Sequence, residues 1–143
     1  MSDRPLLARP AGMGDGDAEL LAAAAELLGT VYREGRHEVA AALRMDDGSI
    51  VTGVHVDGSA RRSAVCAEGV AAGNAIAHGS SVTAAVSVLR RPSGAEHVIE
   101  PCGVCAEMLS DYWPDARVWV TEGAEIVPTT FAALLPAKRR RLW

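Results

Sequence analysis

The spacing of apolar residues changes several times along the chain, and each change marks a predicted element. From Asp17 onward, apolar residues recur at helical spacing until Gly35, which predicts one amphipathic helix. Two apolar runs follow, Val39–Leu43 and Ile50–Val56, separated by the turn residues Asp46-Asp47-Gly48. This arrangement predicts a β-hairpin after the first helix.

The rest of the chain alternates between helical and extended patterns. Small residues crowd the segment from Cys66 to His78, which we expect to form a helix that ends at Gly79. The further expected elements are a strand at Val82–Leu89, a helix at Cys102–Tyr112, a strand at Arg117–Val120, a short strand at Glu125–Val127 and a helix at Phe131–Leu135. This alternation predicts an α/β fold with a mixed sheet covered on both faces.

Two glycines lie inside the predicted Cys66–His78 helix, at positions 69 and 73. A glycine in a helix interior costs about 1 kcal/mol relative to alanine. Gly69 and Gly73 therefore predict that another backbone, from the sheet or from a partner subunit, packs closely against this helix.

The composition indicates a single domain. At 143 residues the chain has an ordinary domain length, and its 49% of apolar residues can form a core, although only 4% are aromatic. We expect a flexible leader at residues 1–16, one folded domain at 17–136 and a basic tail at 137–143. The sequence shows no repeat and no second domain.

Charge and hydropathy limit the classes of partner. The net charge of −4 disfavours a polyanionic partner, so we expect a small-molecule substrate, and a role in nucleic-acid binding rests only on the basic run from Lys138 to Arg141. No apolar run approaches the roughly 20 residues that cross a bilayer, and residues 1–10 lack a secretory signal. We therefore expect the protein to be cytoplasmic, because free thiols persist in the reducing cytoplasm.

The candidate chemistry lies in two short motifs that contain all three cysteines, Cys66-Ala67-Glu68 and Pro101-Cys102-Gly103-Val104-Cys105. Three thiolates bind Zn²⁺ and leave one tetrahedral position open, as in catalytic zinc sites. A carboxylate two residues from a ligand, Glu68, is suited to move protons for a water at that position. The motifs therefore predict a catalytic zinc site.

Three other interpretations of the cysteines stay open. A CxxC motif can be a redox pair, although it then needs neither a third cysteine nor a glutamate. A disulfide framework favours an even number of cysteines. A structural zinc site needs a fourth ligand, and the imidazoles that could supply it are His37, His55, His78 and His97.

The two motifs, together with residues 48–57, resemble the cytidine deaminase superfamily, in particular its small nucleoside-acting branch. The resemblance extends from about Val39 to Trp119. It implies a three-layer α/β/α cytidine deaminase-like sandwich with a mixed sheet of about five strands. It also implies a homotetramer that deaminates a cytosine-type nucleoside, such as cytidine, deoxycytidine or blasticidin S, by attack of zinc-activated water at C4 with release of ammonia.

The resemblance also assigns roles to individual residues. Cys66, Cys102 and Cys105 correspond to the zinc ligands, and Glu68 corresponds to the proton shuttle. The backbone N–H near Ala67 would stabilise the reacting oxygen. The positions that contact the base and the ribose in this family are here occupied by His37, His55 and Asp57.

Several of these positions depart from the family pattern. His37 replaces a phenylalanine that stacks on the pyrimidine, His55 replaces an asparagine, and Asp57 replaces a glutamate. These differences favour, as an alternative, a modified or non-cytosine aminoheterocycle as the substrate. A non-catalytic zinc protein that keeps the fold for assembly is a further alternative, from a different class. Relatives also carry an arginine where this chain has Gly69 or Ala106, so the charge of the thiolates would be offset by the helix ends, by Arg61 or Arg62, or by a partner subunit.

Overall fold

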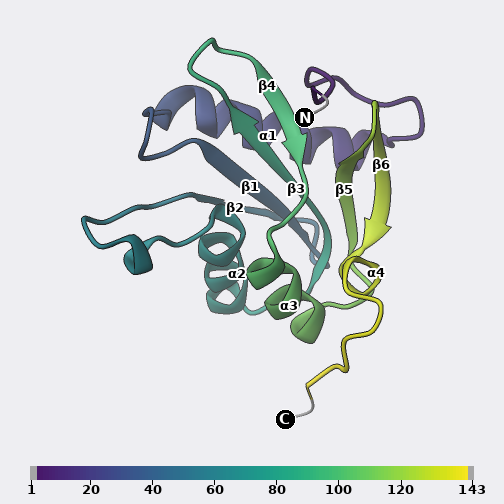
Figure 1. The fold of residues 1–143 in the computed structure, drawn as a ribbon. Helices are drawn as coiled ribbons and strands as arrows, with labels where there is room; N and C mark the ends of the chain where they lie inside the picture. Colours follow the sequence, from purple (N-terminus) through teal and green to yellow (C-terminus); the bar gives the residue numbers. More distant parts are fainter. Residues whose placement is uncertain (1–2, 142–143) are drawn as a thin grey trace.

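The computed structural model describes residues 3–141, with the side chain of Arg61 left out. Four α-helices and six strands make up the fold (Figure 1). In chain order the elements are α1 (Asp15–Val31), β1 (Val39–Met45), β2 (Ile50–Val54), the 3₁₀ turn η1 (Arg61–Ser63), α2 (Ala67–His78), β3 (Val82–Arg90), β4 (Glu96–Ile99), α3 (Gly103–Tyr112), β5 (Arg117–Glu122), β6 (Glu125–Thr130) and α4 (Phe131–Leu134).

The six strands form one mixed sheet. The main order is β2-β1-β3-β5-β6, and β4 pairs with the end of β3 outside this path. All pairs are antiparallel except β3 with β5. The predicted mixed sheet is confirmed, with a sixth strand beyond the five in the main order.

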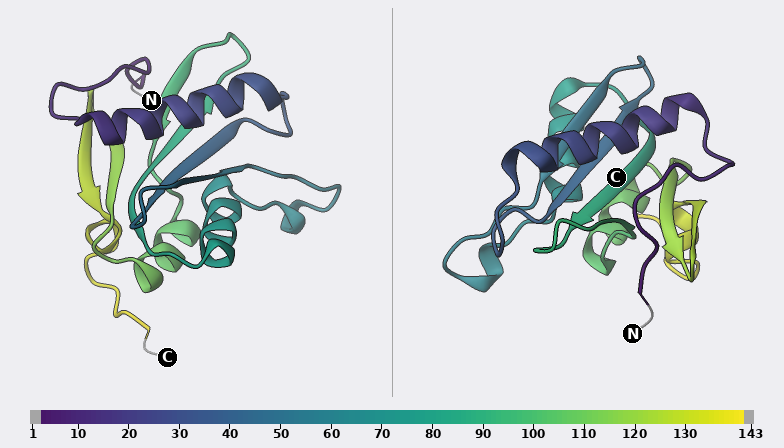
Figure 2. Two further views of the ribbon diagram at one scale, coloured as in Figure 1. Left: turned by 180° about the vertical axis from the view of Figure 1, so that it is seen from behind. Right: turned by 90° about the horizontal axis from the view of Figure 1, so that it is seen from above.

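Helices cover both faces of this sheet. Helix α1 crosses one face, whereas α2, α3 and α4 lie on the other (Figure 2). Strand β1 shows why its sequence is apolar at successive positions: Ala40 and Ala42 belong to the core under α1, and Ala41 and Leu43 belong to the core under α2. A strand buried on both faces needs apolar side chains on both sides.

The segment before α1 differs from the flexible leader that we expected. The backbone N–H of Leu7 donates to the carbonyl of Glu96 in β4 at 2.8 Å. His97 Nδ1 donates to the carbonyl of Pro5 at 2.9 Å, and Met13 is fully buried. Residues 4–13 are therefore attached to the domain through long-range contacts that the local composition does not reveal.

The basic tail is attached as well, as far as the structure describes it. The Asp111 carboxylate at the end of α3 accepts hydrogen bonds from Lys138 Nζ at 2.5 Å and from the Arg141 backbone N–H at 2.9 Å. Arg140 Nε donates to the backbone carbonyl of Asp111. Residues 142 and 143, the last two of the predicted tail, lie outside the described residues.

The close backbone contact of α2 is made by a different glycine from those we expected. A β-carbon at Gly73 would have no neighbour within 4 Å, and one at Gly69 would meet only the Val65 side chain at 3.4 Å and the Met108 side chain at 4.0 Å. Gly53 in β2 instead lies against the α2 backbone. The sheet is thus not the neighbour of Gly69 and Gly73, and the prediction of a partner subunit there stays open.

Candidate metal centre and active site

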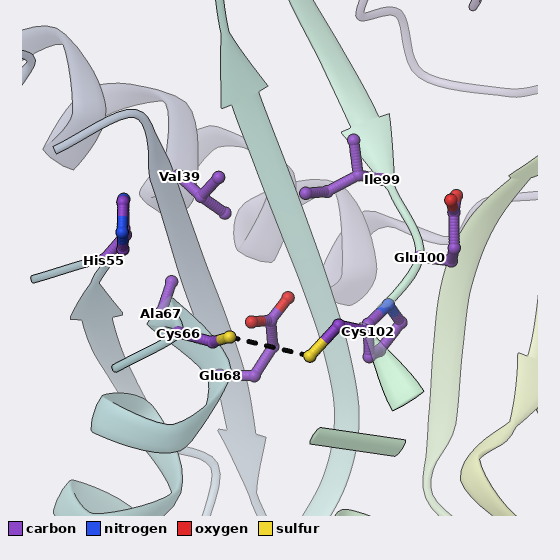
Figure 3. A pocket seen from close by; sticks show the side chains of 9 residues that line it. Val39, His55, Cys66, Ala67, Glu68, Ile99, Glu100 and Cys102 are labelled. Atoms are coloured by element: carbon purple, nitrogen blue, oxygen red, sulfur yellow. Dashed lines mark hydrogen bonds between the residues drawn. The ribbon is translucent and has the colours of Figure 1, made fainter. Parts of the chain in front are cut away.

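The three cysteines converge because two helices begin next to each other. Cys66 is the N-cap residue of α2, Cys102 is the N-cap residue of α3, and Cys105 lies in the first turn of α3. The Sγ atoms of Cys66 and Cys102 are 3.6 Å apart (Figure 3). All three sulfur atoms lie within 4.8 Å of one another.

This spacing fits a tetrahedral zinc ion. Zn–S bonds of about 2.3 Å at the tetrahedral angle hold two sulfur atoms about 3.8 Å apart, close to the separation found here. The cysteines are free, and each lies at a different depth, with Cys102 exposed and Cys105 buried. The donor set therefore suits zinc with one position open toward solvent.

The pKa values of the three thiols are shifted in different directions by their surroundings. Burial raises the pKa of the Cys105 thiol, and the negative charge of Glu68 adds to this effect. Burial also raises the pKa of Cys66. The pKa of Cys102 is lowered in spite of burial, because the backbone N–H of Cys105 and neighbouring donors at the start of α3 stabilise its thiolate. A dication must displace protons from the two more basic thiols, which couples metal binding to pH.

Glu68 stands beside the cysteines, in the first turn of α2. Its side chain is almost fully buried, with an exposed fraction of 5%. The carboxylate points into the pocket between Cys66 and Cys102 (Figure 3). A buried carboxylate that lies next to a metal site and faces a cavity is placed to exchange protons with a bound molecule.

The cysteines open into a cavity of about 340 Å³, within the roughly 300–1,000 Å³ of small-molecule pockets. Its lining comes from β1, the end of β2, the start of α2 and the segment between β4 and α3. The lining residues are Val39, His55, Cys66, Ala67, Glu68, Ile99, Glu100, Pro101 and Cys102.

The predicted substrate contacts divide into two groups. His55 and Ala67 line the cavity, and Ala67 is the first residue of α2, where backbone N–H groups have no acceptor within the helix. His37 and Asp57 do not line it. His37 Nδ1 instead donates to the carbonyl of His55 at 2.8 Å, and Asp57 lies 3.6 Å from His55 Nε2. Both residues therefore contact His55, which lines the cavity, without lining it themselves.

Sequence reasoning missed Val39 in β1 and the part of the lining at the end of β4 and just after it, Ile99, Glu100 and Pro101. Glu100 immediately precedes the Pro101–Cys105 motif. That adjacency was the available signal. Arg62, one candidate for offsetting the thiolate charge, is exposed and does not line the cavity, and the side chain of Arg61 lies outside the described part of the chain.

Comparison with known proteins identifies the family that this chain matches. The family model for the cytidine and deoxycytidylate deaminase zinc-binding region matches residues 15–121. Blasticidin-S deaminase from Bacillus cereus is 35% identical over 130 residues, which cover 87% of this chain and 93% of that protein. Cytidine deaminase from Halalkalibacterium halodurans is 29% identical over 103 residues, which cover 71% of this chain and 76% of that protein.

Solved structures show the same arrangement of elements. The crystal structure of the cytidine deaminase from Bacillus anthracis superposes with a TM-score of 0.75 at 26% identity, covering 85% of this chain and 88% of that one. The cytidine deaminase from Mycobacterium leprae gives a TM-score of 0.69 at 25% identity, covering 87% of this chain and 99% of that one.

Proposed function

Because the chain belongs to the cytidine and deoxycytidylate deaminase family, as a zinc-binding deaminase, we propose that it hydrolyses the exocyclic amine of a cytosine-type nucleoside. The resemblance noted in the sequence is thereby confirmed, and the chain is an enzyme rather than a non-catalytic zinc protein. The observation that carries the proposal is the buried Glu68 carboxylate beside three converging sulfur atoms in one cavity.

In the proposed site, Cys66, Cys102 and Cys105 hold the zinc ion. A zinc ion bound there would supply Lewis acidity, which makes water a nucleophile at neutral pH. The Glu68 carboxylate would take a proton from the attacking water as the water oxygen bonds to C4 of the ring, and would pass this proton to the ring nitrogen N3. Glu68 then moves the second proton to the amino group, the C4–N bond breaks, and ammonia leaves as the carbonyl forms.

The two remaining substrate contacts that line the cavity have separate proposed tasks. The free N–H of Ala67 lies at the positive end of α2 and would stabilise negative charge that develops on the reacting oxygen. His55 would contact the sugar from the end of β2, with its ring held near Asp57. His37 and Asp57 would then act on the substrate through His55.

The test combines metal content with a substrate panel. We expect about one zinc per chain by plasma mass spectrometry, and ammonia release from cytidine, deoxycytidine or blasticidin S. Glu68→Gln should keep the zinc and lose about 10²–10⁴-fold in kcat, the usual contribution of a general acid–base group. The proposal fails if the purified protein holds no zinc, or if Glu68→Gln retains full turnover.

A second candidate substrate is a modified or non-cytosine aminoheterocycle. The observation that favours it is His55 in the cavity lining, because an imidazole differs in shape and charge from the amide it replaces. Aminopurine nucleosides in the same assay test this candidate. Efficient turnover of cytidine together with no turnover of the other heterocycles would exclude it.

We also propose that the chain forms a homotetramer and works in the cytoplasm. Large apolar side chains on the α2–α3 side are exposed, with exposed fractions of 75% for Val104 and 51% for Ile76, and Gly73 lies open beside them. No helix in the described part of the chain is long and apolar enough to span a membrane. Light scattering after gel filtration measures the assembly, and an active monomer would contradict the tetramer.

A further inference from the structure

An ion pair stands at the rim of the cavity, on the side away from His55. Glu100 lines the cavity, and both of its carboxylate oxygens accept hydrogen bonds from Arg4, at 2.6 Å from Nη1 and 2.6 Å from Nη2. Figure 3 shows the Glu100 carboxylate beyond Ile99, across the opening from His55. Its position and geometry therefore suit a planar guanidinium or an ammonium group at the cavity mouth.

Arg4 reaches this place because the segment before α1 is attached to β4. The carbonyl of Pro5 accepts from His97 Nδ1, and Arg91 Nε donates to His97 Nε2 at 3.1 Å, which fixes the tautomer of this buried imidazole. The backbone N–H of Leu7 donates to Glu96. These contacts bring the Arg4 side chain to Glu100 from outside the cavity.

The pair is partly exposed to solvent, so a bound molecule can reach it. The exposed fractions of the side chains are 28% for Arg4 and 44% for Glu100. Solvent screens an ion pair at this level of exposure, which lowers the energy needed to separate it, although its two parallel hydrogen bonds make it stronger than a single-contact surface pair. A cationic group on a bound molecule could therefore take the place of the Arg4 guanidinium without disturbing the fold.

The charge of the cavity also favours a cationic group on the bound molecule. Among the nine residues described as its lining there is no lysine or arginine, whereas Glu68 and Glu100 are both acidic. Thiolates that hold zinc add further negative charge. A cavity of this composition attracts cations and repels phosphorylated molecules.

We propose that Glu100 is a specificity-determining residue, which binds a cationic amino or guanidino group on the substrate outside the ring that is deaminated. Arg4 occupies this position in the absence of substrate and moves aside when the substrate cation arrives. The inference rests on the proposed function, because it concerns the part of the same nucleoside that extends to the cavity mouth.

The test compares matched nucleosides at neutral pH. The probes are cytidine, cytidine analogues with an amino group in place of the 3′- or 5′-hydroxyl, and cytidine 5′-phosphate. The measured quantity is the ratio of kcat/KM for the better amino analogue to kcat/KM for cytidine. Glu100→Gln should lower this ratio by about two- to fivefold, the size expected for one partly exposed ion pair. Arg4→Ala should raise it, because the internal competitor is gone.

Glu107→Gln serves as the matched control, because it removes the same charge from an exposed position on α3 that does not line the cavity. It should leave the ratio unchanged. An unchanged ratio in both Glu100→Gln and Arg4→Ala would overturn the inference alone. So would efficient turnover of cytidine 5′-phosphate by the wild-type protein that is lost in Arg4→Ala, because Arg4 would then bind a phosphate. Zinc-loaded wild-type protein that deaminates none of the probes would overturn the proposed function as well.

Discussion

Gly53 in β2 lies directly against the backbone of Ala71 in α2. A β-carbon added at Gly53 would come within 2.4 Å of the Ala71 amide nitrogen and 2.6 Å of the Ala67 carbonyl oxygen. Real side chains do not tolerate such distances, so only glycine allows α2 to sit this close to the sheet. Since α2 carries Cys66 and Glu68 at its start, this contact sets the depth of the metal centre.

We predict that Gly53→Ala displaces α2 and weakens the zinc site. Overpacking of this kind costs about 1–3 kcal/mol in the free energy of unfolding, and the shift should lower zinc retention and kcat together. Chemical denaturation and metal analysis measure both effects. Unchanged stability and full zinc content would show that β2 moves freely away from the helix.

Gly73→Ala is the matched substitution in α2, the helix that Gly53 contacts. In an isolated chain it should raise stability by about 0.5–1 kcal/mol, because an added methyl group meets no atom within 4 Å and alanine favours a helix. In a tetramer that packs over Gly73, the same methyl group should weaken assembly instead. Light scattering at several protein concentrations distinguishes the two results.

Cys105 is the buried member of the proposed zinc site. We predict that Cys105→Ser abolishes stoichiometric zinc and lowers the melting temperature, because metal binding contributes to folding. A chelator should lower the melting temperature of the wild-type protein by a similar amount. The same chelator should leave Cys105→Ser unaffected, and a further drop would mean that the variant still holds metal.

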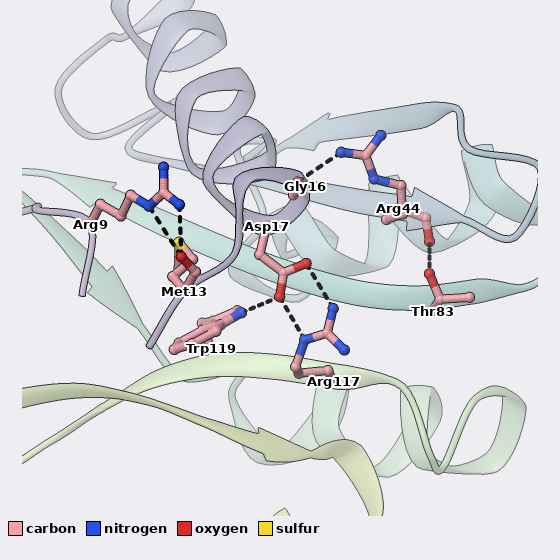
Figure 4. A network of polar contacts seen from close by, with 8 residues as sticks. All are labelled: Arg9, Met13, Gly16, Asp17, Arg44, Thr83, Arg117 and Trp119. Atoms are coloured by element: carbon pink, nitrogen blue, oxygen red, sulfur yellow. Dashed lines mark hydrogen bonds and ion pairs between the residues drawn. The ribbon is translucent and has the colours of Figure 1, made fainter. Parts of the chain in front are cut away.

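The ionisation of Asp17 should make the free energy of unfolding depend on pH in the acid range. Its buried carboxylate accepts hydrogen bonds from Arg117 Nε at 2.6 Å, Arg117 Nη2 at 2.8 Å and Trp119 Nε1 at 2.7 Å (Figure 4). The hydrogen bonds from Arg117 lower the pKa of Asp17, outweighing burial. The carboxylate therefore stabilises the fold above its unfolded pKa of about 3.9, and this contribution is lost as the pH falls through the lower folded value.

We accordingly expect Asp17→Asn to cost about 1–3 kcal/mol at neutral pH, and less in strong acid, where the wild-type carboxyl group is protonated too. Asp15→Asn, an exposed carboxylate on the same helix, should change stability by less than about 0.5 kcal/mol. Denaturation curves across pH measure the difference. A cost at Asp17 that does not change with pH would contradict the ionic role.

His37 should affect the substrate through His55 rather than by stacking on it. We predict that His37→Ala raises KM less than His55→Ala does, because His37 only donates to the His55 carbonyl from outside the cavity. Steady-state kinetics on the best substrate of the panel provide the comparison. A larger effect at His37 would support the direct substrate contact expected from the sequence.

The sequence predicted the cysteines that the structure brings together, because the motifs that contain them are local. Cys66 and Glu68 are two residues apart, Cys102 and Cys105 are one helical turn apart, and the helices that present them have clear apolar periods. The strands of the main sheet were predicted for the same reason, apart from their ends. Each of these features depends on neighbours in the chain.

The features that were missed depend on contacts between distant segments. Strand β4 has only four residues after a turn, too few for a clear period, and becomes visible through its pairing with β3. The partners of Arg4 and Gly53 lie far away in sequence, so composition alone predicted a loose leader and placed the close helix contact at Gly69 and Gly73. The position of His37 behind His55 likewise needed the fold.

The attachment of residues 4–7 to β4 also protects the sheet. The outer edge of a strand carries unpaired amide groups, and such an edge can recruit a strand from another molecule and start aggregation. In this protein the Leu7 N–H already occupies the carbonyl of Glu96 on that edge. A truncated form that begins at α1 would keep the helices and the cysteines, yet we expect it to precipitate more readily during purification and storage.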